Sequence, residues 1–195
     1  FLALNTFYQM LRHMIRSGRL PYVISPGGSS VFGVIGFVNA AMELKEQIEA
    51  GQIIEPDYIY VPAGSTGTAV GLMIGLRVSG LRSKVIIVRV ADSQYVSSKK
   101  IIRLLSKTNY FLHRNDSSFP IIKFSEQDVS IRHDFFGEQY GLFTQEGLDA
   151  ILLLKKEENI ELEGTYTGKT FAALLHDVKT GLLTGKNVLF WNTYN

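Results

Sequence analysis

The segment 63–68, with the sequence AGSTGT, combines small residues with hydroxyl side chains in an order that suits phosphate binding. It follows an aromatic and β-branched run at 58–61 and precedes an apolar stretch that contains two glycines. Glycines let backbone N–H groups converge, the hydroxyls add donors, and the dipole of a helix favours an anion at its N-terminus. This order of residues predicts a phosphate site at a turn between a strand and a helix.

The lack of charged residues in the same segment narrows the choice of ligand. A nucleoside triphosphate site has the pattern GxxxxGK[ST] with its lysine and a metal ligand, whereas 63–68 contains neither lysine nor aspartate. A single phosphate ester fits better. An ordinary strand-to-helix turn capped by hydroxyls would use the same residues. A dinucleotide site needs GxGxxG and an acidic residue about 20 positions later, and neither this segment nor GGSS at 27–30 provides them.

The composition excludes several classes of protein. The 195 residues, 46% hydrophobic with a net charge of +2, indicate a globular domain without the charge excess of nucleic-acid or membrane-surface binding. The absence of cysteine excludes disulfides and thiolate chemistry, and the four histidines lack metal-ligand spacing. No apolar run reaches the ~18 residues of a membrane span. The first residues start apolar but lack a basic leader and a small-residue cleavage site, so we do not expect them to be a signal peptide. We expect a cytoplasmic protein without a metal, nucleic-acid or membrane partner.

Helical and extended segments alternate along the chain, so the sequence predicts an α/β fold with a parallel sheet flanked by helices. The predicted helices are 4–17, 30–50, 68–79, 97–107, 144–157 and 170–179, and the predicted strands are 22–25, 58–62, 84–90, 121–124 and 187–191. Residues 108–120 are expected to be irregular. Ligands of such sheets bind at the carboxyl ends of the strands. We therefore expect the turns at 26–30 and 63–68, the end of the last strand and the loop 166–169 to share one side.

Four segments, in order along nearly the whole chain, resemble one enzyme family. They are PYVISPGGSSVFGVIGFVNAAMEL (21–44), GSTGTAVGL (64–72), GEQYGLFTQEGLDAILLLKKEENIELEGTYTGKTFAALLHDV (137–178) and VLFWNTYN (188–195). Together they resemble the D-cysteine desulfhydrase and 1-aminocyclopropane-1-carboxylate deaminase family. This resemblance implies a pyridoxal-phosphate enzyme of the tryptophan synthase β-like fold, also called fold type II. The chain, 1–195, would be one domain, the large-domain part in the C-terminal portion of a homodimeric lyase or deaminase.

The resemblance also implies roles for individual residues. Tyr166 matches a tyrosine that lies close to the substrate, and it is the predicted catalytic residue. The residues predicted to bind the cofactor are Gly64, Ser65, Thr66, Gly67, Thr68, Thr167 and Thr193. Thr193 matches a hydroxyl residue near the pyridine nitrogen, where a neutral partner gives a weaker electron sink than a carboxylate. Together with the YTGK sequence at 166–169, this favours β-elimination from a small amino acid, giving a 2-oxo acid and ammonia, over the deaminase reaction.

Several positions depart from the family pattern. Glu163-Gly164 replaces an Asp-Pro pair, Thr66 replaces a glycine, and Tyr194-Asn195 replaces a Gly-Gly pair. The Schiff-base lysine of the family lies in an N-terminal portion whose sequence pattern does not occur here, and Lys169 matches a lysine at a helix start instead. We therefore expect this chain alone to lack catalysis. The alternative is a non-catalytic fragment or relative that binds a phosphate ligand or a partner chain. The basic cluster at 99–107 is expected to be a solvated helix face.

Overall fold

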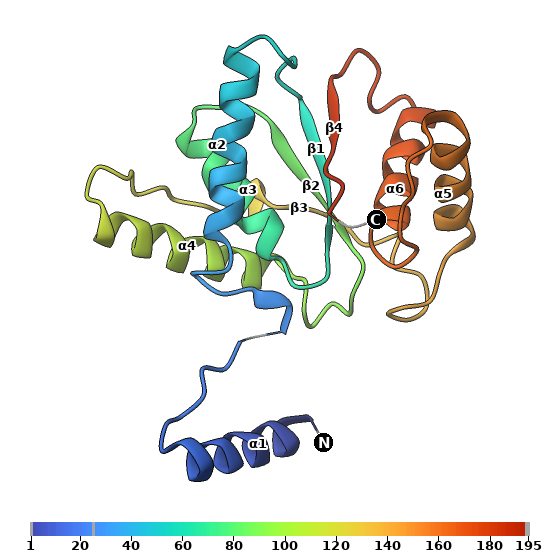
Figure 1. Ribbon diagram of the computed structural model, residues 1–195. Coiled ribbons are helices and arrows are strands. Elements are labelled where there is room, and N and C mark those ends of the chain that lie inside the picture. Colours follow the sequence, from blue (N-terminus) through green and yellow to red (C-terminus); the bar gives the residue numbers. More distant parts are fainter. Residues whose placement is uncertain (1, 25, 194–195) are drawn as a thin grey trace.

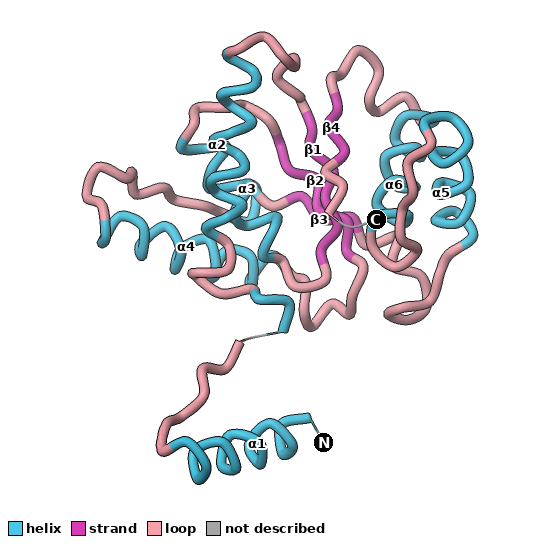
Figure 2. Tube along the Cα trace, in the orientation of Figure 1, coloured by secondary structure: helices cyan, strands magenta, loops and turns pink. Residues whose placement is uncertain are grey.

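The computed structural model, which describes residues 2–24 and 26–193, contains a four-stranded parallel sheet between two groups of helices (Figures 1 and 2). The strands are β1 (Tyr58–Ala63), β2 (Lys84–Arg89), β3 (Ser130–Arg132) and β4 (Val188–Phe190). The helices are α1 (Leu2–Ser17), α2 (Ile35–Glu49), α3 (Gly67–Val78), α4 (Ser98–Asn115), α5 (Gln145–Glu158) and α6 (Thr167–Lys179). Short 3₁₀ turns occur at Pro26–Gly28 and Glu126–Asp128. The predicted alternation of strands and helices is therefore present.

The sheet has the order β3-β2-β1-β4, and all of its described pairings are parallel. β1 lies between β2 and β4, and five of its six residues are buried. A strand that is covered on both faces must be apolar throughout, which explains the YIYVPA sequence of β1. Because the strands are parallel, their carboxyl ends share one edge of the sheet, as predicted.

Two hydrophobic cores lie on opposite faces of the sheet. Ile59 and Val61 of β1 pack with α2, α3 and α4, whereas Tyr60, between them, packs with α6 on the other face. The small residues of α3 serve this packing, since a Cβ at Gly75 would lie 2.4 Å from the carbonyl oxygen of Val38 in α2. Figure 1 shows the two groups of helices on either side of the strands.

An ion pair between buried Asp177 and half-buried Arg132 joins the second core to the edge of the sheet. Asp177 of α6 accepts hydrogen bonds from the Tyr60 hydroxyl and from the guanidinium of Arg132 in β3. Burial by itself raises the pKa of Asp177, but the hydrogen bonds from Tyr60 and Arg132 outweigh it and hold this pKa below its ordinary value. The arrangement fixes α6 against β1 and β3.

Several predicted elements differ from the structure. α4 continues to Asn115 through the segment predicted to be irregular, because Asn109 is buried and uses its amide to bond Pro120 and Ile122. Residues 22–24 and 121–124 are not strands, because neither segment pairs with the sheet, and the prediction for Ser25 lies outside the described residues. The short strand β3 was not predicted, since three residues are too few for a periodicity to be recognised.

Helix α1 lies apart from the sheet and is joined to it by the segment 18–24 (Figure 1). Its apolar side chains are largely exposed, for example Leu4 at 76% and Ile15 at 74%. Among the described residues, no helix combines the length and apolarity required to cross a membrane.

Candidate functional site

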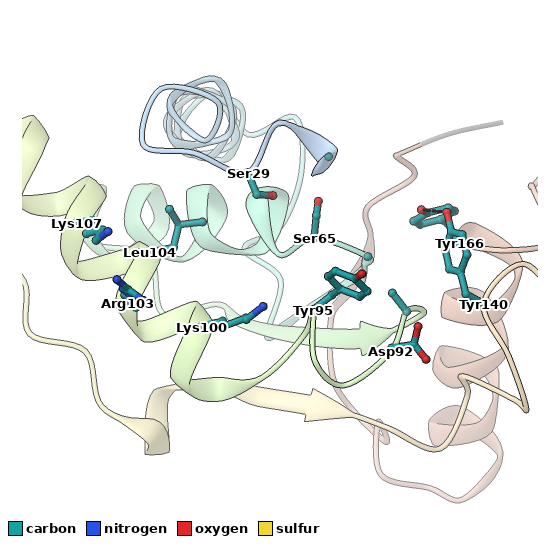
Figure 3. A pocket seen from close by; sticks show the side chains of 13 residues that line it. Ser29, Ser65, Asp92, Tyr95, Lys100, Arg103, Leu104, Lys107, Tyr140 and Tyr166 are labelled. Atoms are coloured by element: carbon teal, nitrogen blue, oxygen red, sulfur yellow. Dashed lines mark hydrogen bonds between the residues drawn. The ribbon is translucent and has the colours of Figure 1, made fainter. Parts of the chain in front are cut away.

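A cavity of about 740 Å³ lies at the carboxyl ends of β1 and β2 (Figure 3). Its walls come from the turn before α2, the turn after β1, the segment after β2, α4 and two tyrosines from the α5–α6 side. The lining residues are Gly27, Ser29, Gly64, Ser65, Ala91, Asp92, Tyr95, Lys100, Arg103, Leu104, Lys107, Tyr140 and Tyr166. The position is the one predicted for a ligand of a parallel α/β sheet.

The predicted phosphate cup forms the turn between β1 and α3. Gly64 and Ser65 line the cavity, and α3 begins at Gly67, so the free N–H groups of its first turn lie beside them. Thr66 is buried and has φ of 71°, a left-handed conformation that β-branched residues rarely adopt. Thr68 is half-buried in the first turn of α3 and is not among the lining residues. The five cup residues are thus contiguous, with two of them at the cavity wall.

Glycines in the cup and in the turn before α2 allow these two turns and the segment that carries Tyr166 to approach one another closely. A Cβ at Gly64 would lie 2.9 Å from Cε1 of Tyr166, and one at Gly67 would lie 2.8 Å from Oγ of Ser29. A Cβ at Gly27 would lie 2.1 Å from Oγ of Ser65. Backbone without side chains, flanked by two serines and a helix N-terminus, fits a phosphate ester. The residues present therefore suit the phosphate of the expected cofactor.

Two tyrosines form the opposite wall of the cavity. The hydroxyl oxygens of Tyr140 and Tyr166 are 2.6 Å apart, and their rings meet edge to face with centroids 6.2 Å apart. Burial, together with the hydrogen bond that Tyr166 shares with Tyr140, raises the pKa of Tyr166 to about 12. The phenol of Tyr166 is therefore protonated at neutral pH. The sequence argument did not single out Tyr140, although the family-like segment 137–178 contains it.

Glu163 holds the turn from which Tyr166 projects. Its carboxylate accepts hydrogen bonds from the N–H groups of Thr165 and Tyr166, the latter at 2.8 Å. A carboxylate at the N-terminus of α6 satisfies free N–H groups and complements the helix dipole. Although Glu163 departs from the family pattern, it therefore forms the hydrogen bonds expected of a capping residue.

The two remaining predicted residues lie outside the cavity wall. Thr167 is fully buried, and its hydroxyl accepts from the N–H of Glu163 at 2.8 Å and donates to the carbonyl of the same residue. Thr193 is exposed beyond β4 and is not among the lining residues. Its segment runs along β1, since the N–H of Trp191 donates to the carbonyl of Tyr60. The predictions for Tyr194 and Asn195 lie outside the described residues.

One wall of the cavity is basic. Lys100, Arg103 and Lys107 follow one face of α4 and line the cavity on the side away from the tyrosines (Figure 3). Asp92 is the one acidic residue among the described lining residues. All three side chains are exposed, as predicted for a solvated helix face, and the turns 27–29 and 64–65 lie across the cavity from them. The excess of positive charge favours an anionic ligand.

Lys169 is fully buried and is not among the lining residues. Its Nζ donates a hydrogen bond to the carbonyl oxygen of Phe136 at 2.6 Å, and burial lowers the pKa of Lys169 below its ordinary value. This location agrees with the interpretation of Lys169 as a helix-start residue rather than a covalent partner of the cofactor. In the described part of the chain, no cluster of three metal-binding side chains occurs.

The chain is similar to known enzymes over most of its length. The sequence profile of a family described as pyridoxal-phosphate dependent enzymes matches residues 4–193. A D-cysteine desulfhydrase from Serratia proteamaculans is 32% identical over 161 residues, which are 83% of this chain and 46% of the relative. One from Yersinia enterocolitica is 34% identical over 158 residues, 81% of this chain and 45% of the relative. The chain spans about half the length of the curated relatives it matches.

Solved structures agree with these relatives. The crystal structure of an ACC deaminase homologue is 28% identical and superposes with a TM-score of 0.79, covering 99% of this chain and 55% of the other. Threonine deaminase isoform 2 from Solanum lycopersicum, at 14% identity, a TM-score of 0.54 and coverages of 93% and 50%, shares the fold. These neighbours are fold type II enzymes, so the predicted fold class is confirmed. With its parallel sheet and a profile match over 4–193, the chain belongs to the pyridoxal-phosphate-dependent enzyme family.

Proposed function

We propose that this chain is the cofactor-phosphate-binding portion of a lyase that eliminates a leaving group from a small amino acid, as a D-cysteine desulfhydrase does. The products would be a 2-oxo acid and ammonia. The observation that carries the proposal is the meeting of the glycine-serine cup with a hydrogen-bonded tyrosine pair in one cavity. In this proposal residues 1–195 form one domain in the C-terminal portion of a homodimeric enzyme.

The cup residues Gly64, Ser65, Thr66, Gly67 and Thr68 would hold the phosphate ester through backbone N–H groups and hydroxyls. When bound, pyridoxal phosphate supplies an electron sink for the substrate. The basic wall of α4 would raise the local concentration of the anionic cofactor, because fields from like charges add within a cleft. Each of these roles follows from a residue at the cavity or in the turn that forms it.

Tyr166 would act on the substrate as a proton carrier at its hydroxyl. Its high pKa keeps the proton on oxygen at neutral pH, and the hydrogen bond with Tyr140 fixes the direction of that hydroxyl. Thr167 would support this role indirectly, since its hydroxyl closes the turn that carries Tyr166. Thr193 would be the neutral partner of the pyridine nitrogen, which favours elimination over the deaminase reaction.

The binding part of the proposal is tested with pyridoxine 5′-phosphate, which has the phosphate but no aldehyde to react with surface lysines. Isothermal titration calorimetry of the 195-residue chain should detect this ester and not unphosphorylated pyridoxine. Ser65→Ala should weaken binding, whereas Ser79→Ala, at the opposite end of α3, should not. Equal affinity for the two compounds would contradict a phosphate cup.

Catalysis by the chain alone is tested separately. Incubation with pyridoxal phosphate and either D-cysteine or 1-aminocyclopropane-1-carboxylate, followed by an assay for 2-oxo acid, should give no product. The reason is that, among the described lining residues, the lysines lie on α4, across from the cup rather than beside Tyr166 (Figure 3). Product formation above a no-protein control would show that the chain carries a complete catalytic site, against the proposal.

A further inference from the structure

Lys169 is a buried ammonium group that the proposed chemistry does not use. It lies in the first turn of α6, has no exposed surface, and donates from Nζ to the carbonyl oxygen of Phe136. Lysine is almost never fully buried without a paired charge, because removal of an ammonium from water is costly. Among the described residues, no carboxylate lies at ion-pair distance from Nζ. The negative charge of Glu163 acts in the opposite direction and favours the charged form of Lys169, but it does not outweigh burial.

The surroundings of Nζ restrict where the ammonium group can point. Nζ lies 5.6 Å from the centroid of the Phe136 ring, and the guanidinium of Arg89 lies 4.4 Å from the same centroid. A Cβ at Gly137 would lie 3.9 Å from Nζ and 2.8 Å from Cγ2 of Thr144, so the chain next to Phe136 fits tightly. The ammonium is therefore directed at one carbonyl group in a narrow space, with an aromatic face beside it.

The residues just before α6 contact the segment 136–143 at two further positions. Tyr166 bonds Tyr140, and a Cβ at Gly164 would lie 2.6 Å from the ring of Phe143. The segment is not helix or strand, and two of its glycines have left-handed backbone angles. Its path is therefore set by the contacts at its two ends and at Tyr140, rather than by secondary structure.

We propose that Lys169 is a positioning residue. By its hydrogen bond to the carbonyl of Phe136, it keeps the hydroxyl of Tyr140 hydrogen-bonded to the hydroxyl of Tyr166 at the cavity wall. The proposal rests on the proposed function in one respect: in the proposed lyase, the tyrosine pair would contact the substrate. The geometry itself can be tested without cofactor. An ammonium replaced by a methyl group would leave the carbonyl of Phe136 unsatisfied, and the segment would move to reach water.

The test uses the full chain labelled with 3-fluorotyrosine and observed by ¹⁹F NMR at neutral pH. The resonances of Tyr140 and Tyr166, among nine tyrosines, are assigned with the Tyr140→Phe and Tyr166→Phe variants. In Lys169→Met, the Tyr166 resonance should move to the position that it has in Tyr140→Phe. In Lys179→Met, a matched change at an exposed position of the same helix, it should stay at its parental position.

A rescue experiment separates the ammonium from the bulk of the side chain. The chain contains no cysteine, so Lys169→Cys can be alkylated at one site in the unfolded state and refolded. Aminoethylation restores an ammonium at the same reach and should restore the parental Tyr166 resonance. Propylation gives an apolar side chain of equal length and should leave the resonance displaced.

Two outcomes would overturn the assignment. The first is a folded Lys169→Met chain, by circular dichroism, in which the Tyr166 resonance is parental. The second is failure of Lys169→Met and of the less apolar Lys169→Gln to fold, which would make Lys169 a residue of stability instead. Because no ligand is present, neither outcome depends on the proposed lyase, whose own test is the binding of pyridoxine 5′-phosphate.

Discussion

Gly64→Ala would place a methyl group between the cofactor cup and the tyrosine pair. The new Cβ would lie 2.9 Å from Cε1 and 3.1 Å from the hydroxyl oxygen of Tyr166. Carbon atoms in contact prefer about 3.5–4.0 Å, so the ring must retreat by roughly 0.6–1.1 Å. Gly64 has no left-handed backbone angle, so the effect would come from space alone.

The size of the effect follows from this displacement. A shift of the Tyr166 ring by that amount would break its 2.6 Å hydrogen bond with Tyr140. Added bulk in a packed site costs about 1–3 kcal/mol of folding free energy. For a chain of this length each kcal/mol lowers Tm by about 2–4 °C. The affinity for pyridoxine 5′-phosphate should fall about tenfold, which corresponds to ~1.4 kcal/mol.

Thermal unfolding by circular dichroism and calorimetric titration measure the two effects. The matched control is Gly36→Ala, because a Cβ at Gly36 in α2 would meet no atom within 4 Å. Alanine there should stabilise the chain by about 0.5–1 kcal/mol and leave binding unchanged. The reasoning would be refuted if Gly64→Ala unfolded at the parental temperature and bound the ester with parental affinity.

Three further changes test other parts of the structure. Tyr140→Phe should lower the pKa of Tyr166 from about 12, so that the last part of the rise in tyrosinate absorbance at 295 nm is complete at lower pH; an unchanged last part would count against the hydroxyl pair. Asp177→Asn should lower the free energy of unfolding at neutral pH by about 1–3 kcal/mol, since it removes the acceptor of the charge-assisted hydrogen bond from half-buried Arg132. Because the folded pKa of Asp177 is depressed, its contribution is present above the ordinary aspartate pKa and disappears as pH falls, so parent and variant should converge in urea unfolding at low pH. Lys100→Glu should weaken ester binding in low salt and less so in high salt, whereas Lys99→Glu, off the cavity wall, should have little effect. Equal losses of affinity in the two variants would show that the lysine at the cavity wall has no specific role in binding.

Local features of the sequence were sufficient for the elements around the cup. The apolar run of β1, the small residues that follow it and the apolar helix α3 are contiguous, so strand, turn and helix could be predicted together. The parallel sheet followed from the alternation of such units, and the order of four family-like segments identified the cofactor class. The boundary of α4 was missed, because Asn109 is polar in sequence yet buried through bonds to a distant loop.

The composition of the site depended on tertiary structure. Tyr140 meets Tyr166 across 26 positions, and Lys169 meets Phe136 across 33. No periodicity encodes such contacts, since they depend on how the segment before α5 packs on the start of α6. In the same way α4 could be predicted as amphipathic, but its basic face became a cavity wall only through the turns opposite it. The sequence determined the strand, turn and helix that we propose for phosphate binding, and long-range packing decided which side chains line the cavity beside them.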